Sequence, residues 1–417
     1  MKKNITALFL VLTVSFFAFA AEEPAVTYDE IDLSFSPTMT WYDAMGQSGL
    51  AHPERLDSFF TNPAAIQGKG LRLDSPSISL TVYNLEKLVS DPEAVDIFNK
   101  MLKGEASDEE KTKYAVKIID NLGSGHNIAT KLDFGISARI GSVGFGTNAQ
   151  LKLHSLNPGK TITSQTLIPE INIAQTVGLG FRIIDTDALS LSAGASLHWV
   201  LKTYFKGISG GKLMSMFSGG EDFTKTLVWD TPVMGGWALP FDLGVTLGLF
   251  NDTFTIAATA NNINGIYHMK SHTGVGYMLN KEAPEDAPEK RDSVEFDVKT
   301  PWTLNFGVAF APELGVFKPV VTLDFIDMFD LVKSFGSEYF RASDLLLHMN
   351  FGAEIGLTDF VQLRAGVNRG FVSVGTGIWL MFAQMDVSYG WQEFGVELGD
   401  KPVDALTVRF IIGYDKK

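Results

Sequence analysis

From residue 70 to the C-terminus, apolar residues recur at every second position in short segments. In the segment TLNFGVAF, Leu304 and Phe306 share one face of an extended chain, whereas Thr303 and Asn305 share the other. This is the period of a β-strand whose two faces meet different surroundings. Beyond residue 20, the chain has no apolar run of about 18 residues, the length that a membrane helix needs. The chain is therefore predicted to be all-β.

Residues 1–20 read as a secretory signal peptide. Two lysines precede an apolar stretch at 5–17, and Ala18-Phe19-Ala20 provides a cleavage site, so we expect the mature chain to start at Ala21. An exported chain with 45% apolar residues and no apolar helix is typical of a transmembrane antiparallel β-barrel in the bacterial outer membrane. The alternative is an exported soluble β-sandwich, because its strands alternate as well. The polar faces here are rich in Gly, Ser, Ala and Asn, which favours the lining of a narrow or filled lumen.

About fourteen strand segments can be counted, beginning near residues 72, 127, 143, 171, 188, 239, 252, 302, 317, 345, 359, 371, 383 and 405. Tight turns alternate with long connections along this series, and outer-membrane barrels have short periplasmic turns and longer external loops. We therefore predict a barrel over residues 71–417, with long external loops at 200–238, 262–300 and 328–344. A further external insertion, at 85–122, reads as two short amphipathic helices.

Residues 21–70 have no strand periodicity and contain several Pro and Gly residues. The segment is too long for a tail and too apolar for a solvated arm, so we predict that it folds into the lumen as a plug. Asn62 and Pro63 are expected to form a turn, since Pro presets φ and Asn caps its own backbone. Ala64 is small enough to lie against the barrel wall.

The Gly-rich stretch Met45–Leu50, followed by Phe60-Thr61-Asn62-Pro63-Ala64-Ala65-Ile66 and the first strand, resembles the plug of FadL-like outer-membrane long-chain fatty-acid transporters. The run at 363–391 is similar to the closing hairpins of that superfamily. The resemblance implies that a hydrophobic small molecule, such as a long-chain fatty acid, is captured outside, held in the barrel and released sideways through the wall. It also implies outer-membrane lipid and the barrel assembly machinery as partners.

Charged residues on the inward faces are the candidate ligand-binding groups. A fatty-acid carboxylate needs one or two cations in an apolar pocket, and arginine suits it because it can donate two parallel hydrogen bonds. The candidates are Lys152, Arg182, Arg364 and Arg409. The alternative role for each is to pair with a lumen acid and brace the barrel.

Several function classes are disfavoured by the sequence. A net charge of −14 does not suit nucleic-acid binding, which requires a basic surface. There is no Gly-x-Ser-x-Gly or His-Glu-x-x-His motif, and the pair His268 and His272 lacks the third ligand of a zinc site. We therefore expect no catalytic residues, no metal and no cofactor. The alternative functions are a passive diffusion pore and a structural barrel that partners another envelope protein.

Overall fold

The computed structural model describes residues 35–52, 57, 60–68, 70–107, 109–110, 113–114, 117, 128–156, 166–209, 225–315, 317–335, 341–358, 360–394, 398–399 and 402–416. The predicted signal peptide and residues 21–34 lie outside these ranges.

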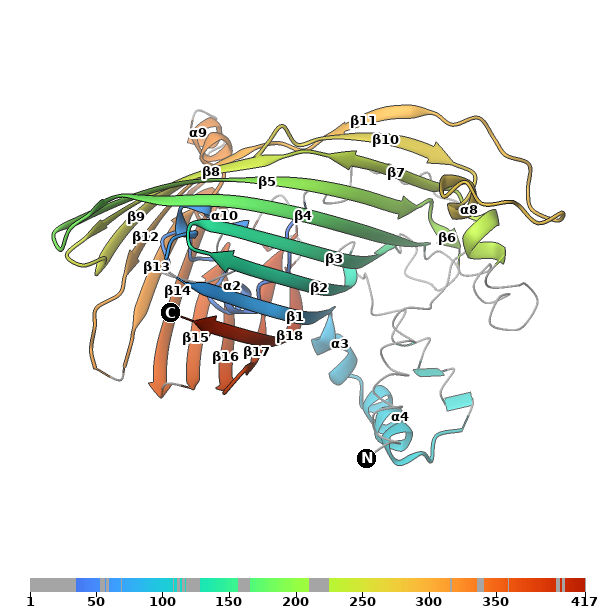
Figure 1. The fold of residues 1–417 in the computed structure, drawn as a ribbon. Coiled ribbons are helices and arrows are strands. Elements are labelled where there is room, and N and C mark those ends of the chain that lie inside the picture. The colour runs from blue at the N-terminus through green and yellow to red at the C-terminus, as the bar shows by residue number, and fades with distance from the viewer. Residues whose placement is uncertain are drawn as a thin grey trace.

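The strands form a single closed antiparallel sheet (Figure 1). The first strand, β1 (Leu71–Tyr83), pairs with β2 (Ile128–Ile140) on one side and with the last strand, β18 (Pro402–Lys416), on the other. This closure excludes the β-sandwich. The strands between them are β3 (Val143–Leu156), β4 (Thr166–Asp185), β5 (Leu189–Phe205), β6 (Ile208–Ser209), β7 (Val233–Ala238), β8 (Phe241–Leu249), β9 (Phe254–Ile263), β10 (Ile266–His272), β11 (Glu295–Lys299), β12 (Thr303–Phe310), β13 (Val320–Phe325), β14 (Met349–Thr358), β15 (Val361–Asn368), β16 (Phe371–Leu380) and β17 (Ala383–Glu393).

Three strands of the wall are each interrupted once. β7 and β8 both pair with β5. On their other side, β8 pairs with β9 and β7 pairs with β10. Next around the ring, β9 pairs with β12 and β10 pairs with β11. Each of these three pairs therefore makes one wall strand. With the two-residue β6 set aside, the wall has the 14 strands that were predicted.

The predicted loops at 200–238 and 262–300 are too wide. β5 continues to Phe205, and β7, β10 and β11 add wall in ranges that the sequence pattern assigned to loops. Proline and glycine at the interruptions read as the ends of strands, but the chain resumes pairing with the same neighbours beyond them. The wall is therefore taller on this side than the sequence predicts.

Helices lie in the longer connections between the wall strands, at the end of the wall here called the loop end. They are α3 (Leu85–Val89), α4 (Pro92–Lys103), η5 (Thr226–Asp230), α8 (Val275–Met278), α9 (Met328–Phe335) and α10 (Ala342–Leu347). The opposite end, with the tight turns and the C-terminus, is called the turn end. In the predicted insertion, α4 begins where the Asp91 side chain accepts hydrogen bonds from the Glu93 and Ala94 amides, and it ends at Gly104 with φ 75°. Further along, hydrogen bonds from Lys100 and Ser107 lower the pKa of Glu110 to about 2.

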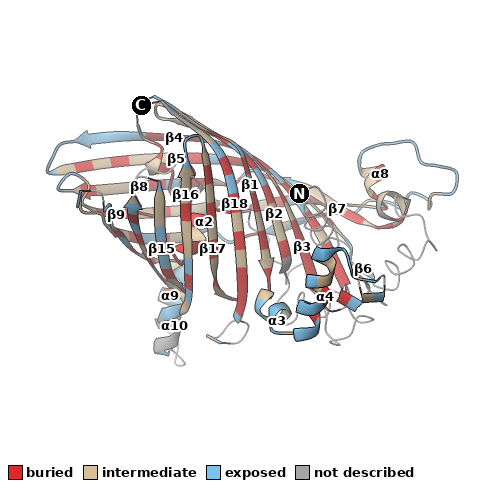
Figure 2. Cartoon of the chain, turned by 90° about the horizontal axis from the view of Figure 1, so that it is seen from below, coloured by how far each residue is buried: buried red, intermediate tan, exposed pale blue. Residues whose placement is uncertain are grey.

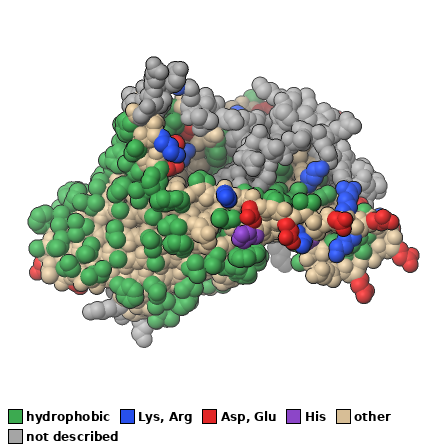
Figure 3. Space-filling view, turned by 90° about the horizontal axis from the view of Figure 1, so that it is seen from above, with side chains coloured by type: hydrophobic (Ala, Val, Ile, Leu, Met, Phe, Trp, Pro, Cys, Tyr) green, Lys and Arg blue, Asp and Glu red, His purple; other side chains and the backbone are tan. Residues whose placement is uncertain are grey.

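Side chains alternate between the two faces of the wall, which gives the bands of buried and exposed residues in Figure 2. Phe306 and Phe310 are exposed on the outer face of β12, and Asn305 and Ala309 are buried on its inner face, as predicted. Apolar side chains cover much of the outer surface in Figure 3, while charged ones gather toward one end. An outer face of this kind suits contact with lipid.

A row of tryptophans marks one edge of the apolar belt. Trp199, Trp237 and Trp302 are exposed by 42%, 46% and 46% on the outer face, close to the three strand interruptions. Toward the loop end, the exposed pairs His268–Asp297 and Lys270–Glu295 follow on β10 and β11. Tryptophan favours the boundary between hydrocarbon and head groups, so this row indicates the level at which lipid contact ends. Within the described ranges, no helix has the length and apolarity needed to cross a membrane.

Candidate functional site

The described residues 35–52, 57 and 60–68 lie inside the barrel and are here called the lumen segment (Figure 1). Its helix α2 (Thr40–Ala44) packs on β15 to β18, and its short helix η3 (Pro63–Ala65) packs on β4, β5 and β8. In the order of strands around the ring, these two groups lie on opposite sides. Trp41, Met45 and Ala64 are buried almost completely, at 1%, 0% and 0% exposure. The described part of the predicted plug therefore lies inside the barrel and contacts opposite sides of its wall.

The wall beneath η3 is built from glycine. A Cβ atom at Gly180 would overlap the carbonyl oxygen of Ile66, and one at Gly194 would overlap that of Pro63. The backbone of the lumen segment thus lies directly on the backbone of β4 and β5, a close approach that only glycine permits. The sequence pattern suggested that the inward glycines line the lumen. In the structure they lie directly against the backbone of the lumen segment, and such a contact surface is here called a glycine seat.

A second seat holds the other end of the lumen segment on β13 to β16. A Cβ atom at Gly366 would overlap the backbone of Met45. Nearby, the Asp324 carboxylate accepts hydrogen bonds from the Gly49 amide at 2.6 Å and the Leu50 amide at 3.0 Å. A buried carboxylate of the wall therefore fixes the turn that follows α2.

The predicted plug motif forms a turn. The Asn62 side chain accepts a hydrogen bond from the Ala64 amide at 3.0 Å, and Pro63 opens η3. The same side chain donates to the Leu50 carbonyl at 2.8 Å, a contact that the sequence does not predict. Asn62 and Ala64 are 1% and 0% exposed. Asn62 thus links the turn at Leu50 to the short helix η3, and this pair of hydrogen bonds is here called the Asn62 clasp.

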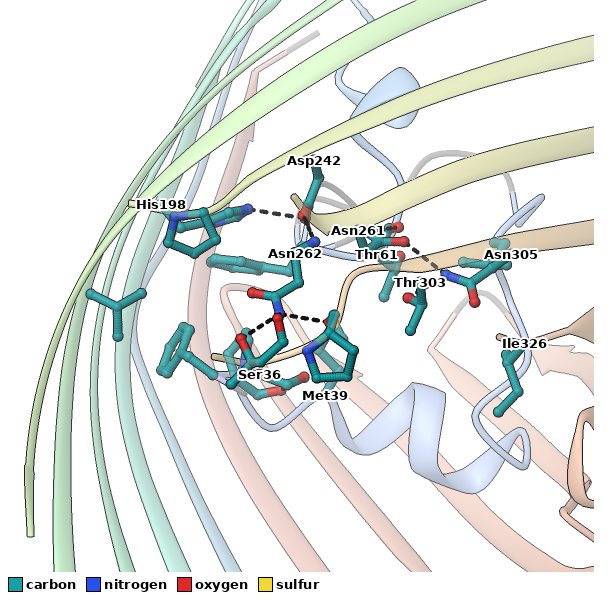
Figure 4. A pocket seen from close by; sticks show the side chains of 18 of the residues that line it. Ser36, Met39, Thr61, His198, Asp242, Asn261, Asn262, Thr303, Asn305 and Ile326 are labelled. Atoms are coloured by element: carbon teal, nitrogen blue, oxygen red, sulfur yellow. Dashed lines mark hydrogen bonds and ion pairs between the residues drawn. The ribbon is translucent and has the colours of Figure 1, made fainter. Parts of the chain in front are cut away.

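Three cavities surround the lumen segment. The first, of about 530 Å³, lies between Phe35, Met39 and Phe60 of the segment and the wall residues His198 and Asn262 (Figure 4). The second, of about 490 Å³, lies on the other side of α2 and has a polar lining that includes Lys152. The third, of about 320 Å³, lies toward the turn end and is bordered by Arg182. The lumen segment therefore borders all three cavities.

The first cavity reaches the wall where the three strands are interrupted, here called the wall break. The interruptions are Leu239–Pro240, Asn264–Gly265 and Thr300–Trp302, and the cavity lining includes Pro240, Lys299 and Pro301. Proline has no amide hydrogen, so it cannot continue the ladder of backbone hydrogen bonds.

Side chains replace part of the missing ladder at the wall break. Asn262 donates to the Thr300 hydroxyl at 2.6 Å and to the Pro301 carbonyl at 2.9 Å, and Asp242 accepts from the Asn262 amide at 2.7 Å. Asp242 also contacts His198 at 3.0 Å, and Figure 4 shows these groups along the edge of the cavity. Two backbone bonds remain at the interruptions, from the His198 amide to the Pro240 carbonyl at 2.9 Å and from the Thr300 amide to the Gly265 carbonyl at 2.7 Å. The wall is thus held here by these two bonds and by side chains, with fewer backbone bonds than the continuous strands have.

The four predicted cations all have acidic partners and do not form one site. Arg364 contacts Glu354 at 2.6 Å and Asp386 at 2.7 Å. Arg409 contacts Asp57 of the lumen segment at 2.6 Å.

Arg182 is near the turn end and pairs with Asp185 and Asp252. Lys152 has the longest contact of the four, 4.0 Å to Glu170. Each of the three arginines thus has an acidic partner within 2.8 Å, and Lys152 has the longest contact.

A buried basic cluster beside Lys152 was missed by the sequence analysis. Glu170 contacts Lys202 at 2.7 Å and His154 at 2.9 Å, so that among the described residues three basic side chains converge on this carboxylate. Lys202 fell in a predicted loop because β5 was expected to end before it. Its inward position follows from the same alternation once the strand is extended to Phe205.

An apolar patch lies next to this cluster. Val200 and Tyr204 flank Lys202 on β5, and they pack with Tyr267, Met269 and partly buried Phe35. The Lys202 Nζ atom lies 5.3 Å from the centre of the Tyr267 ring. Among the described residues, no group of His, Cys, Asp and Glu is arranged to hold a metal ion.

No family model matches the chain, and no curated protein matches it. Among solved structures it is similar to the CymD monoaromatic hydrocarbon channel, with a TM-score of 0.46 and 11% identity over 90% of this chain and 97% of that one. It is also similar to the Pseudomonas putida toluene transporter TodX, with a TM-score of 0.45 and 10% identity over 91% and 98%. A Pseudomonas aeruginosa FadL homologue gives a TM-score of 0.43 and 11% identity over 91% and 99%. The fold assignment itself rests on the strand pairing described above.

Proposed function

We propose that the chain is an outer-membrane barrel that takes up hydrophobic small molecules and releases them sideways through the wall break. The observation that carries this proposal is the cavity of about 530 Å³ between the lumen segment and the interrupted strands. A cavity that ends at a weakly paired part of the wall offers a ligand a route that avoids the closed middle of the lumen. A simple diffusion pore needs no such arrangement.

The ligand class that fits best is an amphiphile with an apolar chain and an anionic head, such as a long-chain carboxylate. Phe35, Met39 and Val200, which line the first cavity, supply apolar surface for the chain. Lys152, which lines the second cavity, and Lys202, which shares the Glu170 carboxylate with it, supply positive charge for the head, because a charged head cannot be buried without a partner. In this proposal Lys152 keeps its predicted role as a ligand-binding cation, and Arg182, Arg364 and Arg409 brace the barrel and its lumen segment.

Binding of oleate and of oleyl alcohol to the purified protein tests the ligand class. Replacing Lys202 by Met removes a charge-assisted contact of about 1.5–3 kcal/mol, so oleate should bind roughly ten- to a hundredfold more weakly. Binding of oleyl alcohol should not change. Lys270→Met, on the outer face of the wall, is the matched control. Equal loss of both ligands would assign Lys202 to the structure of the barrel, and no binding of either ligand by the unaltered protein would reject the proposal.

A reversible crosslink tests lateral release, because the chain has no cysteine of its own. Ile266 and Lys299 face each other across β10 and β11 at the edge of the wall break, so Ile266→Cys with Lys299→Cys can lock it. Oxidation should stop transfer of bound ligand to vesicles without preventing binding, and reduction should restore transfer. The control pair is Ala260→Cys with Leu304→Cys, which joins β9 and β12 within the continuous wall. Unchanged transfer by the oxidised first pair would exclude release at the wall break.

A further inference from the structure

The helix α9 carries its apolar side chains outward. Its residues Val332 and Phe335 are exposed by 60% and 54%, whereas Leu331, at the edge of the same face, is buried at 2%. At 3.6 residues per turn, Asp330 and Lys333 lie on the opposite side of the helix. An amphipathic helix that packed against the barrel for its stability would bury the centre of its apolar face instead.

The position of α9 relates this face to the apolar belt. Phe329 meets Trp302 edge to face, with ring centroids 4.6 Å apart. Trp302 lies at the tryptophan row on the outer surface, and Phe306 and Phe310 continue from it along the exposed face of β12. The apolar face of α9 is therefore continuous with the surface that meets lipid, at the level where the belt ends.

We propose that α9 lies on the membrane beside the wall break, with the face formed by Val332 and Phe335 among the acyl chains of the outer leaflet. A short helix with one apolar and one charged face binds at the boundary between head groups and hydrocarbon. Asp330 and Lys333 then face the head groups and water. We take the occupant of this face to be lipid, because α9 joins the apolar belt through the contact of Phe329 with Trp302.

Site-directed fluorescence in vesicles tests this placement. Single cysteines are introduced at Val332, at Lys333 on the opposite face, at Phe306 on the belt and at Glu285 in the loop at 279–294, and each is labelled with an environment-sensitive dye. Quenching is measured with iodide in water and with phosphatidylcholine carrying a nitroxide near the head of the acyl chain. All four variants keep the remaining apolar surface of α9, and ligand binding and heat modifiability report that each has folded.

The label at Val332 is expected to behave like the one at Phe306, with strong quenching by the nitroxide lipid and several-fold weaker quenching by iodide than at Lys333. Iodide quenching at Val332 equal to that at Glu285 would overturn the proposal, since the face would then be in water. Protection from both quenchers would overturn it as well, because protein would cover the face. Neither result bears on whether the cavity binds a ligand.

Discussion

Asn62 donates its side-chain amide to the backbone carbonyl of Leu50 at 2.8 Å, across eleven intervening residues of the lumen segment. Leu50 in turn donates its own amide to Asp324 of the wall, and Asn62 leads into the helix seated on Gly194. Asn62 thus connects the two sides of the barrel wall that the lumen segment contacts, at Asp324 and at Gly194. Leu50 also borders both the first and the third cavity, so this contact lies between them.

Replacing Asn62 by Ala should loosen this connection. The change removes one hydrogen bond to Leu50 and one to Ala64, each of which contributes about 1 kcal/mol. We expect larger and more frequent current fluctuations in planar bilayers, with the barrel still inserted. Asn62→Asp keeps the acceptor for Ala64 but sets a buried carboxylate against the Leu50 carbonyl, so it should loosen the connection at least as much. Equal currents in all three proteins would show that the clasp does not hold the cavities apart.

Asp324→Ala should destabilise the turn after α2. It leaves the buried amides of Gly49 and Leu50 without their acceptor, at a cost of about 1–3 kcal/mol for each. Hydrogen exchange at these amides should accelerate strongly, while exchange in β13 and β14 changes little. Asp324→Asn retains one acceptor oxygen and should show a smaller effect. Uniform acceleration through the strands would instead indicate a role in the stability of the whole barrel.

The glycine seat predicts different effects for two neighbouring substitutions. Gly194→Ala places a methyl group on the backbone of Pro63, which cannot move without displacing η3. Gly178→Ala meets only the Cδ1 atom at the tip of the Ile66 side chain, which can rotate away. We expect the first variant to expose the lumen segment to protease at the turn end and the second to resemble the unaltered protein. Equal sensitivity of the two variants would argue against a backbone seat.

Removing residues 22–68 should leave a barrel that inserts into membranes and conducts small solutes better. The wall strands pair with each other without the lumen segment, and the segment occupies space beside the cavities. Single-channel conductance in planar bilayers measures the change. A barrel whose conductance did not rise would show that other residues close the lumen.

The alternation of outward and inward side chains along each strand could be predicted from the sequence. Phe306 and Asn305 could be assigned to opposite faces because lipid and lumen demand an alternation that extends along the whole strand. Lys202 could not be placed, because Pro240, Gly265 and Pro301 look like strand ends unless the pairing beyond them is known. The partners of the cations were equally hidden, since Arg409 pairs with Asp57, more than three hundred residues away along the chain.

The two glycine seats also bear on the order in which the barrel assembles. The lumen segment precedes every strand, whereas its seats lie on β4, β5 and β8 and on the much later β14, β15 and β16. Contacts between residues far apart in sequence form slowly, because closing a long loop costs chain entropy. If the lumen segment first binds β4, β5 and β8, it can then bind β14 to β16 as they fold. This would bring the early and late strands close together before β1 pairs with β18. Ring closure is therefore expected to be templated from within, by a segment that crosses no membrane itself.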